Sequence, residues 1–351
     1  MQSSLLSILR CPLSGSSLSL KYIGTQTGEE IRDGILLSKA GPCFPILEGV
    51  PRMLPDAMFE HEDFLKSHSP DFSDRKARSI SQFGEIIAEA EKKNRKTRAS
   101  FSEEWASHDY EKGKTWELDI HAQLQRFLTE TDESIFSLQG KLLLDAGCGN
   151  GHLAMELAKN QIEIVAMDFS KSIIRAAKIN ENPLCHFVQG DVEFPPFEKG
   201  IFDLIQSSGV LIHTRNTKNS FGHLAAFVKP GGRISIWVYR KRKEIIHQLF
   251  NQIRKFTSSM PGWLQGPFLR IFIFLPALTA KKIRGNTQKS SELWVEVLDW
   301  FTPEFRWEHS VEEVMDWFDE QGFYNKKLSD QNHWGFNITG IKTRPKVETP
   351  T

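Results

Sequence analysis

From about residue 136 onward, short apolar runs alternate with amphipathic segments. The runs predict strands, and the segments between them carry apolar residues at helical spacing. This alternation predicts an α/β domain in which helices cover both faces of a parallel sheet. The expected strands are residues 141–146, 163–168, 186–189, 202–207 and 233–239, and the expected helices are 153–160, 170–179 and 220–228.

The alternation is interrupted after the fifth strand, which the turn segment KPGGR at 229–233 precedes. Residues 240–300 form an insertion with its own apolar and aromatic residues. Beyond it, Ser310 and Glu313 have the spacing of a capping box, which predicts a further helix. Weak alternation at 324–328 and 335–342 adds two strands, so we expect a Rossmann-like, seven-stranded, mostly parallel sheet in a domain spanning 136–345.

Two further units precede this domain. Residues 1–56 predict a compact α+β module, with a helix at 4–10 and short strands at 17–22 and 34–38. Residues 57–135 are polar and helical in pattern, and we interpret them as a linker that also covers a bound ligand. Its charged segment predicts a solvent-exposed helix face, whereas four aromatic residues are candidates for ligand contact: Phe101, Trp105, Tyr110 and Trp116.

Composition limits the function classes. The chain has 351 residues, with 44 Lys and Arg against 44 Asp and Glu, so its formal net charge is zero. Nucleic-acid-binding proteins usually carry a basic excess, so a nucleic-acid partner is not expected. The first residues lack a secretory leader, no apolar run reaches the roughly 18–20 residues of a spanning helix, and the four Cys are scattered. We therefore expect a cytoplasmic protein without a membrane span.

The first strand of the main domain runs into a glycine turn, LLLDAGCGNG, at residues 142–151. Glycine lets a ligand approach the backbone closely because it has no Cβ. The dinucleotide-binding fingerprint G-x-G-x-x-G would require a third glycine where this chain has His152. The pattern that remains is D-x-G-x-G-x-G, which begins at Asp145.

This segment resembles motif I of the class I methyltransferases that bind S-adenosylmethionine. Later segments resemble further motifs of that family in the same order, because Asp168 ends the second strand and Asp191 follows the third. The resemblance implies that Asp168 binds the ribose hydroxyls and that Asp191 meets the adenine amino group. The cofactor-binding residues that it implies are Asp145, Gly147, Cys148, Gly149, Gly151, Asp168, Phe169, Asp191, Val192 and Ser207.

Methyl transfer from a sulfonium depends strongly on alignment of the acceptor atom behind the methyl carbon. Whether a general base is needed depends on the pKa of the acceptor. His213, at the end of the fourth strand, and His309, before the last helix, are candidate bases, and Tyr239 is a candidate to orient the acceptor. Position favours His213, because ligands of open α/β sheets lie beyond the strand carboxyl ends, although a structural role is an equal alternative.

The insertion lies where such methyltransferases commonly carry a substrate lid. Its apolar residues, which include Trp263, Phe268 and Phe272, either line a hydrophobic acceptor pocket or form a helical cap with its own core. Because Lys281 and Lys282 lie nearby, weak peripheral contact with a membrane is a further alternative.

The N-terminal module resembles a small zinc-ribbon-like unit. The resemblance rests on residues 5–18 and 43–54, where that unit would place two Cys-x-x-Cys pairs. Only Cys11 and Cys43 are present, because Ser14 and Ala40 stand at the partner positions. Two thiolates cannot complete a tetrahedral zinc site, so we expect this fold without a metal.

Three functions follow from these features. The main hypothesis is methyl transfer from S-adenosylmethionine to an O, C or N atom of a small-molecule or lipid-like acceptor. An RNA methyltransferase is the first alternative, because enzymes of that kind can join a zinc-ribbon unit to this fold. A non-catalytic binding protein that keeps the fold is the second, and the intact Asp145, Gly147, Gly149 and Asp168 count against it.

Overall fold

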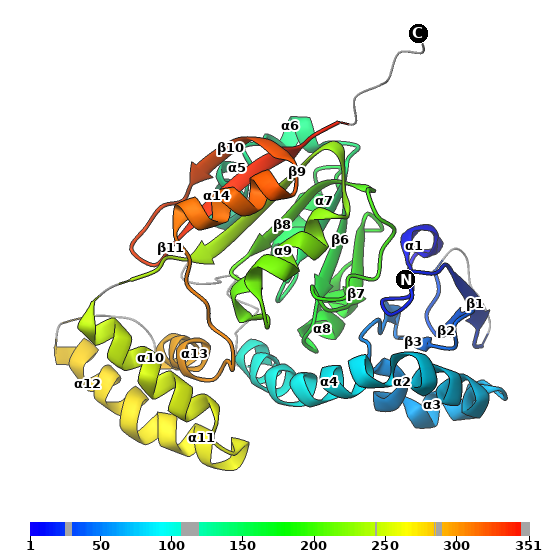
Figure 1. Ribbon diagram of the computed structural model, residues 1–351, viewed down its shortest axis with the longest axis horizontal. Helices are drawn as coiled ribbons and strands as arrows, with labels where there is room; N and C mark the ends of the chain where they lie inside the picture. The colour runs from blue at the N-terminus through cyan, green and yellow to red at the C-terminus, as the bar shows by residue number, and fades with distance from the viewer. Residues whose placement is uncertain (25–29, 107–118, 243, 284, 286–289, 345–351) are drawn as a thin grey trace, which may run out of the picture.

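The computed structural model describes residues 1–351 apart from 25–29, 107–118, 243, 284, 286–289 and 345–351. In the described part, a seven-stranded sheet forms the centre and a four-stranded sheet lies beside one of its edges. A group of helices, α10 to α13, projects from the opposite side (Figure 1). Tyr110 and Trp116, two of the candidates for ligand contact, lie outside the described residues.

The large sheet has the strand order β10-β11-β9-β8-β5-β6-β7. Neighbours among β5 to β9 are parallel, whereas β10 and β11 pair antiparallel, which confirms the predicted fold class. The strand order reverses around β5, and ligands of such sheets bind beyond the carboxyl ends at this point. The strands are β5 (Leu142–Ala146), β6 (Glu163–Asp168), β7 (Cys185–Gln189), β8 (Phe202–Ser208), β9 (Val228–Tyr239), β10 (Phe323–Ser329) and β11 (Gly335–Lys342).

Helices cover both faces of this sheet because successive strand residues point to opposite sides. Leu143 belongs to a cluster with helices α5, α7 and α8, whereas its neighbour Leu144 belongs to a cluster with α9 and α14. Both leucines are buried. The helices are α5 (Ile120–Thr131), α6 (Ile135–Leu138), α7 (His152–Ala158), α8 (Ser172–Ile179), α9 (Thr217–Ala225) and α14 (Val311–Glu320).

The fifth strand is longer than its sequence suggests. The KPGGR segment, expected to be a turn, belongs to β9, which begins at Val228. Gly231 has a φ of 82°, and a Cβ on Gly232 would lie 2.9 Å from the carbonyl oxygen of Asp203. The two glycines therefore let an irregular start of β9 run close beside β8, and the pairing shifts register there.

The N-terminal module contains a four-stranded antiparallel sheet in the order β1-β2-β3-β4. Among the residues that the structure describes, no group of three or more His, Cys, Asp and Glu could hold a metal ion. Hydroxyl groups link the turns instead, because Ser16 Oγ lies 2.9 Å from Ser14 Oγ and 3.0 Å from Ser38 Oγ. The elements are α1 (Ser3–Ile8), β1 (Leu18–Tyr22), β2 (Gly34–Ser38), β3 (Cys43–Leu47) and β4 (Val50–Pro51).

This module is joined to the edge of the large sheet. The Met53 N–H donates to the carbonyl oxygen of Gln189 at 2.8 Å, and Arg52 forms a parallel bridge with the same residue at the end of β7. Leu9 forms a second bridge with Phe197. Both residues belong to the cluster that contains the centre of the large sheet, so the module and the main domain share one hydrophobic core.

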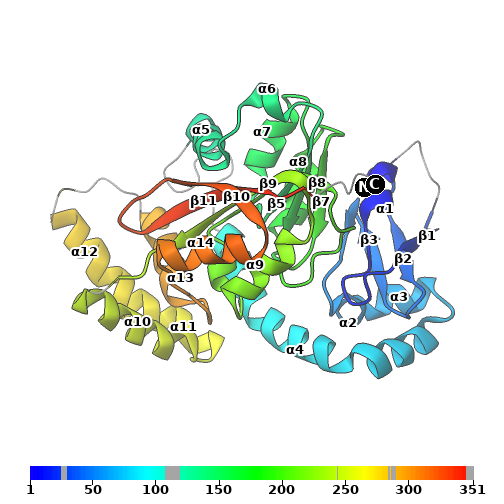
Figure 2. The same ribbon diagram turned by 45° about the horizontal axis from the view of Figure 1, so that its top comes forward.

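Helix α4 (Phe72–Ala106), which follows α2 (Ala57–Glu60) and α3 (Glu62–His68), extends from the N-terminal module toward α13 (Figures 1 and 2). Its 35 residues correspond to about 52 Å of helix. Glu89 on this helix forms an ion pair with Arg215, which lies before α9, at 2.6 Å. A single continuous helix of 35 residues thus occupies a little under half of the segment 57–135 that we expected to be a linker.

The insertion is a separate group of helices, as Figure 2 shows. It comprises α10 (Ile245–Ser258), α11 (Gly262–Leu269), a π-helical segment (Arg270–Phe274), α12 (Leu275–Ile283) and α13 (Ser290–Phe301). Leu269, Phe274 and Val297 are buried in a cluster of its own. Of the two alternatives for the insertion, its helices therefore form a cap with its own core, and α12 and α13 also reach the central cavity.

Candidate functional site

The glycine turn after β5 is held against the end of β6. The N–H groups of Gly147 and Cys148 both donate to the carbonyl oxygen of Met167, at 2.7 and 3.1 Å. Gly147 has a φ of 98°, and a Cβ there would lie 2.2 Å from a methyl carbon of Val210. No larger residue fits this position, so the turn presents bare backbone to the cavity beyond the strands.

Asp168 connects the same two strand ends through its side chain. One carboxylate oxygen accepts the Gly149 N–H at 2.8 Å, and the other accepts the N–H and Oγ of Ser170 at 2.7 and 2.6 Å. Burial raises the pKa of Asp168, although these hydrogen bonds lower it in part. A carboxylate oxygen has two lone pairs, so Asp168 is fixed in orientation and retains acceptor capacity for hydroxyl groups.

Asp191 occupies the corresponding position after β7. Its carboxylate accepts the N–H of Glu193 at 2.9 Å, and the side chain is buried. A Cβ on the preceding Gly190 would lie 2.7 Å from Met167 Sδ. Asp168, Phe169, Asp191 and Val192 all line one cavity with the glycine turn, as the resemblance implies for a nucleoside site.

The pKa values of two other groups at this turn are raised, so their neutral forms are favoured. Burial, and then the charge of Asp168, raise the pKa of Asp145 to about 7. Burial also raises the pKa of the Cys148 thiol, which lines the cavity. Cys148 is therefore a neutral wall residue, whereas Asp145 becomes a carboxylate most easily when a cation lies beside it.

A further wall of the cavity comes from the end of the segment 57–135, although the sequence singled out none of the residues that form this wall. Gln123, Arg126 and Glu130 line it from helix α5, together with Gln206 from β8. Arg126 Nε donates to Glu130 at 2.7 Å, and Gln206 Nε2 donates to the other Glu130 oxygen at 3.0 Å. Burial raises the pKa of Glu130, against the charge of Arg126.

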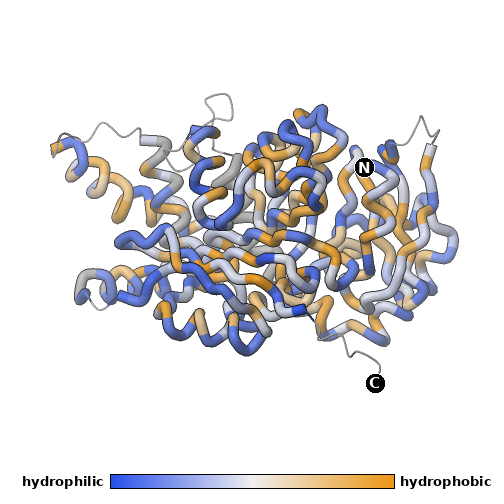
Figure 3. The backbone as a smooth tube through the Cα atoms, turned by 90° about the horizontal axis from the view of Figure 1, so that it is seen from above, coloured by the Kyte–Doolittle hydropathy of each residue, from blue (hydrophilic) through white to orange (hydrophobic). Residues whose placement is uncertain are grey.

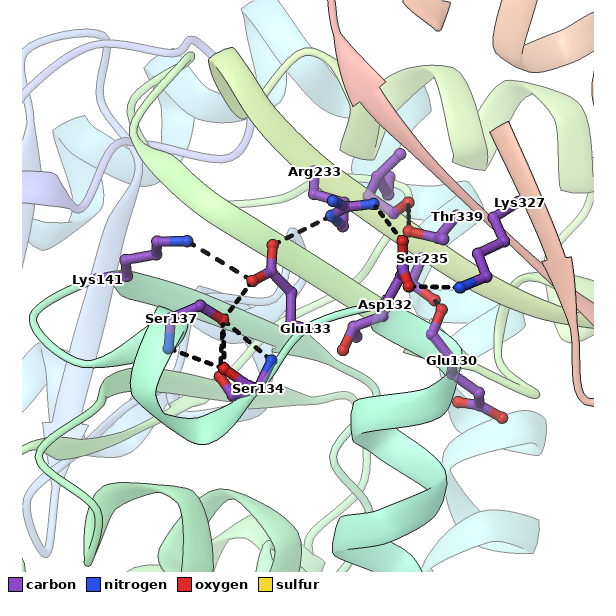
Figure 4. Close-up of polar contacts among 12 residues, drawn as sticks. Glu130, Asp132, Glu133, Ser134, Ser137, Lys141, Arg233, Ser235, Lys327 and Thr339 are labelled. Carbon is purple, nitrogen blue, oxygen red and sulfur yellow. Dashed lines mark hydrogen bonds and ion pairs between the residues drawn. The ribbon is translucent and has the colours of Figure 1, made fainter. Parts of the chain in front are cut away.

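The end of α5 is fixed by polar contacts to the sheet (Figure 4). The Glu130 carbonyl oxygen accepts the Ser235 hydroxyl of β9 at 2.9 Å and Nδ2 of Asn337 of β11 at 2.8 Å. Glu133 accepts from Arg233 at 3.2 Å. Helix periodicity predicts α5 but not these contacts, which orient its cavity-facing side chains.

In the sheet, β8 and β9 lie on one side of β5, and β6 and β7 lie on the other. His213, which follows β8, and Tyr239, which ends β9, therefore lie across β5 from Asp168 and Asp191. His213 ends a 3₁₀ turn after β8, and its Nδ1 lies 2.9 Å from the Phe305 carbonyl oxygen. A carbonyl can only accept, so Nδ1 carries the proton and the neutral ring has its lone pair on Nε2. The rings of His213 and Tyr239 are perpendicular, with centroids 6.1 Å apart.

Aromatic residues from distant segments complete this part of the cavity. Trp237 and Tyr239 come from β9, Trp300 from α13, and Trp334 from the segment before β11. The buried guanidinium of Arg306 lies between two of these rings, 4.0 Å from the Tyr239 centroid and 4.1 Å from the Trp300 centroid. Cation–π contacts of this kind attach the insertion to the sheet.

Three predicted residues do not line the cavity. Ser207 points away from it and donates to the Ala146 carbonyl oxygen at 2.9 Å, whereas its neighbour Ser208 lines the cavity. Gly151 begins α7 and packs closely against Phe187. His309 is buried elsewhere, with its ring nitrogens 2.9 Å from Glu313 and 3.0 Å from Thr217 Oγ1.

The cavity has a volume of about 700 Å³, within the range of ligand-binding clefts. It runs continuously from the nucleoside residues to the aromatic residues, so two ligands can meet inside it. Bare glycine backbone, an oriented carboxylate and a buried acidic residue fit an adenosine-containing cofactor.

This chain is similar in sequence to known methyltransferases. A family profile described as "Methyltransferase domain" matches residues 143–232. The ubiquinone biosynthesis O-methyltransferase of Coxiella burnetii is 33% identical over 195 residues, which cover 49% of this chain and 81% of that protein. The biotin biosynthesis bifunctional protein BioHC of Cellvibrio japonicus is 30% identical, over 45% of this chain and 30% of that protein.

A solved structure has a similar arrangement of elements at low sequence identity. The magnesium protoporphyrin IX methyltransferase of Synechocystis PCC 6803, with bound SAH, is 15% identical with a TM-score of 0.40. The match covers 70% of this chain and 98% of that one.

Proposed function

Because this chain belongs to the class I S-adenosylmethionine-dependent methyltransferases, we propose that it methylates an oxygen atom of a small-molecule or lipid-like acceptor. S-adenosylmethionine is its cofactor. The observation that carries the proposal is the continuous cavity, in which the nucleoside residues at one end share a single space with His213 and an aromatic wall.

The residues after β5, β6 and β7 would hold the nucleoside half of the cofactor. Asp168 would accept hydrogen bonds from the ribose hydroxyls, and Asp191 would accept one from the adenine amino group. Phe169 and Val192, which line the cavity beside these carboxylates, would flank the base.

The amino-acid half of the cofactor carries a carboxylate and an ammonium group. Arg126 of α5 is a cation that lines the cavity, and Asp145 of β5 is a buried carboxyl group that lines the same cavity. We assign the carboxylate to Arg126 and the ammonium to Asp145, because each pairing brings opposite charges together in a site of low polarity. The ammonium would keep Asp145 ionised.

When bound, S-adenosylmethionine supplies a methyl group already activated on a sulfonium. The main task of the protein is then to align the acceptor, which can lower a barrier by up to about 7–11 kcal/mol in favourable cases. Trp237, Tyr239 and Trp300 would hold the acceptor by its apolar surface. Arg306 would fix Tyr239 and Trp300 relative to each other, so it acts as a positioning residue.

His213 would remove the proton of the acceptor hydroxyl. The Phe305 carbonyl oxygen holds Nδ1–H, so the lone pair of the neutral ring is on Nε2. The hydroxyl proton would move to Nε2 as the acceptor oxygen takes the methyl group, whose bond to the cofactor sulfur would break to leave a neutral thioether. The O-methyltransferase relative supports an oxygen acceptor.

Two measurements test this proposal. Calorimetry with S-adenosylmethionine should show binding by the wild-type protein and at least about 100-fold weaker binding by Asp168→Asn, which loses charge-assisted hydrogen bonds. Transfer of labelled methyl groups should then be compared among phenols, catechols and amines, each with and without an alkyl chain. Undiminished binding by Asp168→Asn would remove the cofactor assignment, and transfer to amines alone would refute the oxygen acceptor.

A further inference from the structure

The insertion contains an apolar helix that is only partly covered by protein. Residues Trp263–Ile283 form one helix of 21 residues with a mean hydropathy of 1.3, and 11% of that window is buried. By length and composition alone it is long and apolar enough to cross a membrane, although the apolar run in the sequence falls short of a spanning segment. Arg270 and Pro276 interrupt the apolar run in the sequence, but the helix continues through both.

Large apolar side chains gather on the outer side of this helix and of the adjacent α10. We call this the outer face, and its members are Phe256, Trp263, Ile271, Phe272, Leu275 and Ile283, between 49% and 81% exposed. The Phe268 ring joins two of them, with centroids 6.1 Å from Phe256 and 4.7 Å from Phe272. Apolar residues recur along these helices in Figure 3. A contiguous apolar patch marks an interaction surface, whereas single exposed residues do not.

The charges around the outer face have one sign. Residues 245–291 contain no Asp or Glu but seven Lys and Arg, although the whole chain has equal numbers of each. Lys255, Arg270 and Lys282 are exposed on the same helices. Basic residues beside exposed Trp and Phe are typical of helices that lie in the interface of an anionic membrane.

The opposite side of the helix packs against α13. Leu269 and Phe274 are buried against Leu293, Val297 and Phe301 of α13. A helix that crossed the bilayer would have to give up this core. The geometry therefore points to a helix that lies flat, and we propose that the outer face docks this enzyme on the surface of a bilayer with anionic headgroups.

The docking surface is connected to the cavity. Lys281 of α12 and Trp300 of α13 line the cavity, and Lys281 forms an ion pair with Glu296 at 3.1 Å. Helix α12 thus contributes Leu275 and Ile283 to the outer face and Lys281 to the lining of the cavity. A lipid-like acceptor would enter from the bilayer beside α12, a step that rests on the proposed function, whereas docking itself does not.

Sedimentation with vesicles tests the docking surface in the full-length protein. The wild type should bind vesicles of phosphatidylcholine with phosphatidylglycerol more strongly than vesicles of phosphatidylcholine alone. The double variant Trp263→Ser/Phe272→Ser should bind at least about tenfold more weakly. Lys255→Glu/Lys282→Glu should lose the preference for phosphatidylglycerol. Phe136→Ser is the matched control, because this residue of α6 is 84% exposed but lies outside the insertion.

Several outcomes would overturn the proposal. The wild type could bind neither kind of vesicle, or Phe136→Ser could bind as weakly as the double variant. Ultracentrifugation could also show a dimer that the double variant no longer forms. If an RNA oligonucleotide displaced the protein equally from both kinds of vesicle, and Trp263→Ser/Phe272→Ser also lost RNA binding, the outer face would be a nucleic-acid site. Calorimetry with S-adenosylmethionine on the same samples separates the two proposals, because absent cofactor binding with intact vesicle binding refutes only the proposed function.

Discussion

At the residue scale, the buried Asp145 lowers the free energy of unfolding when it is ionised and no ligand is bound. Its pKa is raised to about 7, mainly by burial and then by Asp168, from an ordinary value of 3.8. A carboxyl group whose pKa is higher in the folded state than in the unfolded state lowers the free energy of unfolding once the pH is high enough to ionise it. The free energy of unfolding should therefore fall as the pH rises from about 4 to 7, and the loss persists above pH 7.

We expect Asp145→Asn to stabilise the cofactor-free protein and to weaken cofactor binding. The gain should grow between pH 4 and pH 7 and reach on the order of 2–4 kcal/mol at pH 8, because the amide carries no charge to desolvate. Urea unfolding across this pH range measures the gain, with the exposed Asp316→Asn as control. An effect of Asp145→Asn that is the same at every pH would contradict the explanation.

The two candidate histidines have different surroundings and should respond differently. His213→Gln should lower kcat by about 100- to 10,000-fold and remove the acidic limb of the pH–kcat profile, while cofactor affinity stays unchanged. His309→Gln should keep that limb, since His309 lies off the cavity between Glu313 and Thr217. A profile that keeps its acidic limb in His213→Gln would show that His213 is not the base.

At the scale of elements, the glycine turn depends on both backbone conformation and space. Gly147→Ala should weaken cofactor binding at least about 100-fold and lower the Tm, because the new Cβ meets Val210 at 2.2 Å. Gly140 also has a positive φ, of 70°, but its Cβ would meet open space.

Gly140→Ala therefore isolates the backbone strain, which is about 1–2 kcal/mol. Combining Gly147→Ala with Val210→Ala should recover part of the stability, as differential scanning calorimetry would measure. Equal losses in Gly140→Ala and Gly147→Ala would mean that the contact with Val210 is unimportant.

At the scale of the whole molecule, the N-terminal module and the main domain share a core across the β7 edge. We expect one cooperative unfolding transition rather than two. Leu9→Ala, at a fully buried position that bridges to Phe197, should lower the free energy of unfolding for this single transition by about 2–5 kcal/mol. Leu264→Ala, on the exposed part of the insertion, should leave it unchanged. Two transitions in calorimetry, with only the smaller one affected by Leu9→Ala, would show that the module folds independently.

The shared core also explains how the module keeps its shape. Burial raises the pKa of Cys43 to about 12, so this residue is a neutral thiol packed in the core. Cys11 is also buried. Hydroxyl contacts among Ser14, Ser16 and Ser38, and apolar packing around Cys11 and Cys43, hold the turns of this module.

The sheet and the nucleoside residues could be predicted from the sequence alone. Strand and helix periods are local properties, and five parallel strands with a helix between most of them have few ways to arrange themselves. Asp145, Asp168 and Asp191 each end or follow a strand, and the carboxyl ends of parallel strands share one edge. Their convergence on one cavity therefore follows from chain order and topology.

Only the tertiary structure decided the rest of the site. Arg126, Trp300 and Trp334 come from three segments separated by up to about two hundred residues, and their meeting depends on how these segments pack together. The joint between Met53 and Gln189, and the outer face of the insertion, likewise depend on which surfaces the fold covers. The sequence therefore determined which strand-end residues line one side of the cavity, because these positions follow from chain order, whereas packing between distant segments determined the aromatic side of the cavity and the exposed apolar face of the insertion.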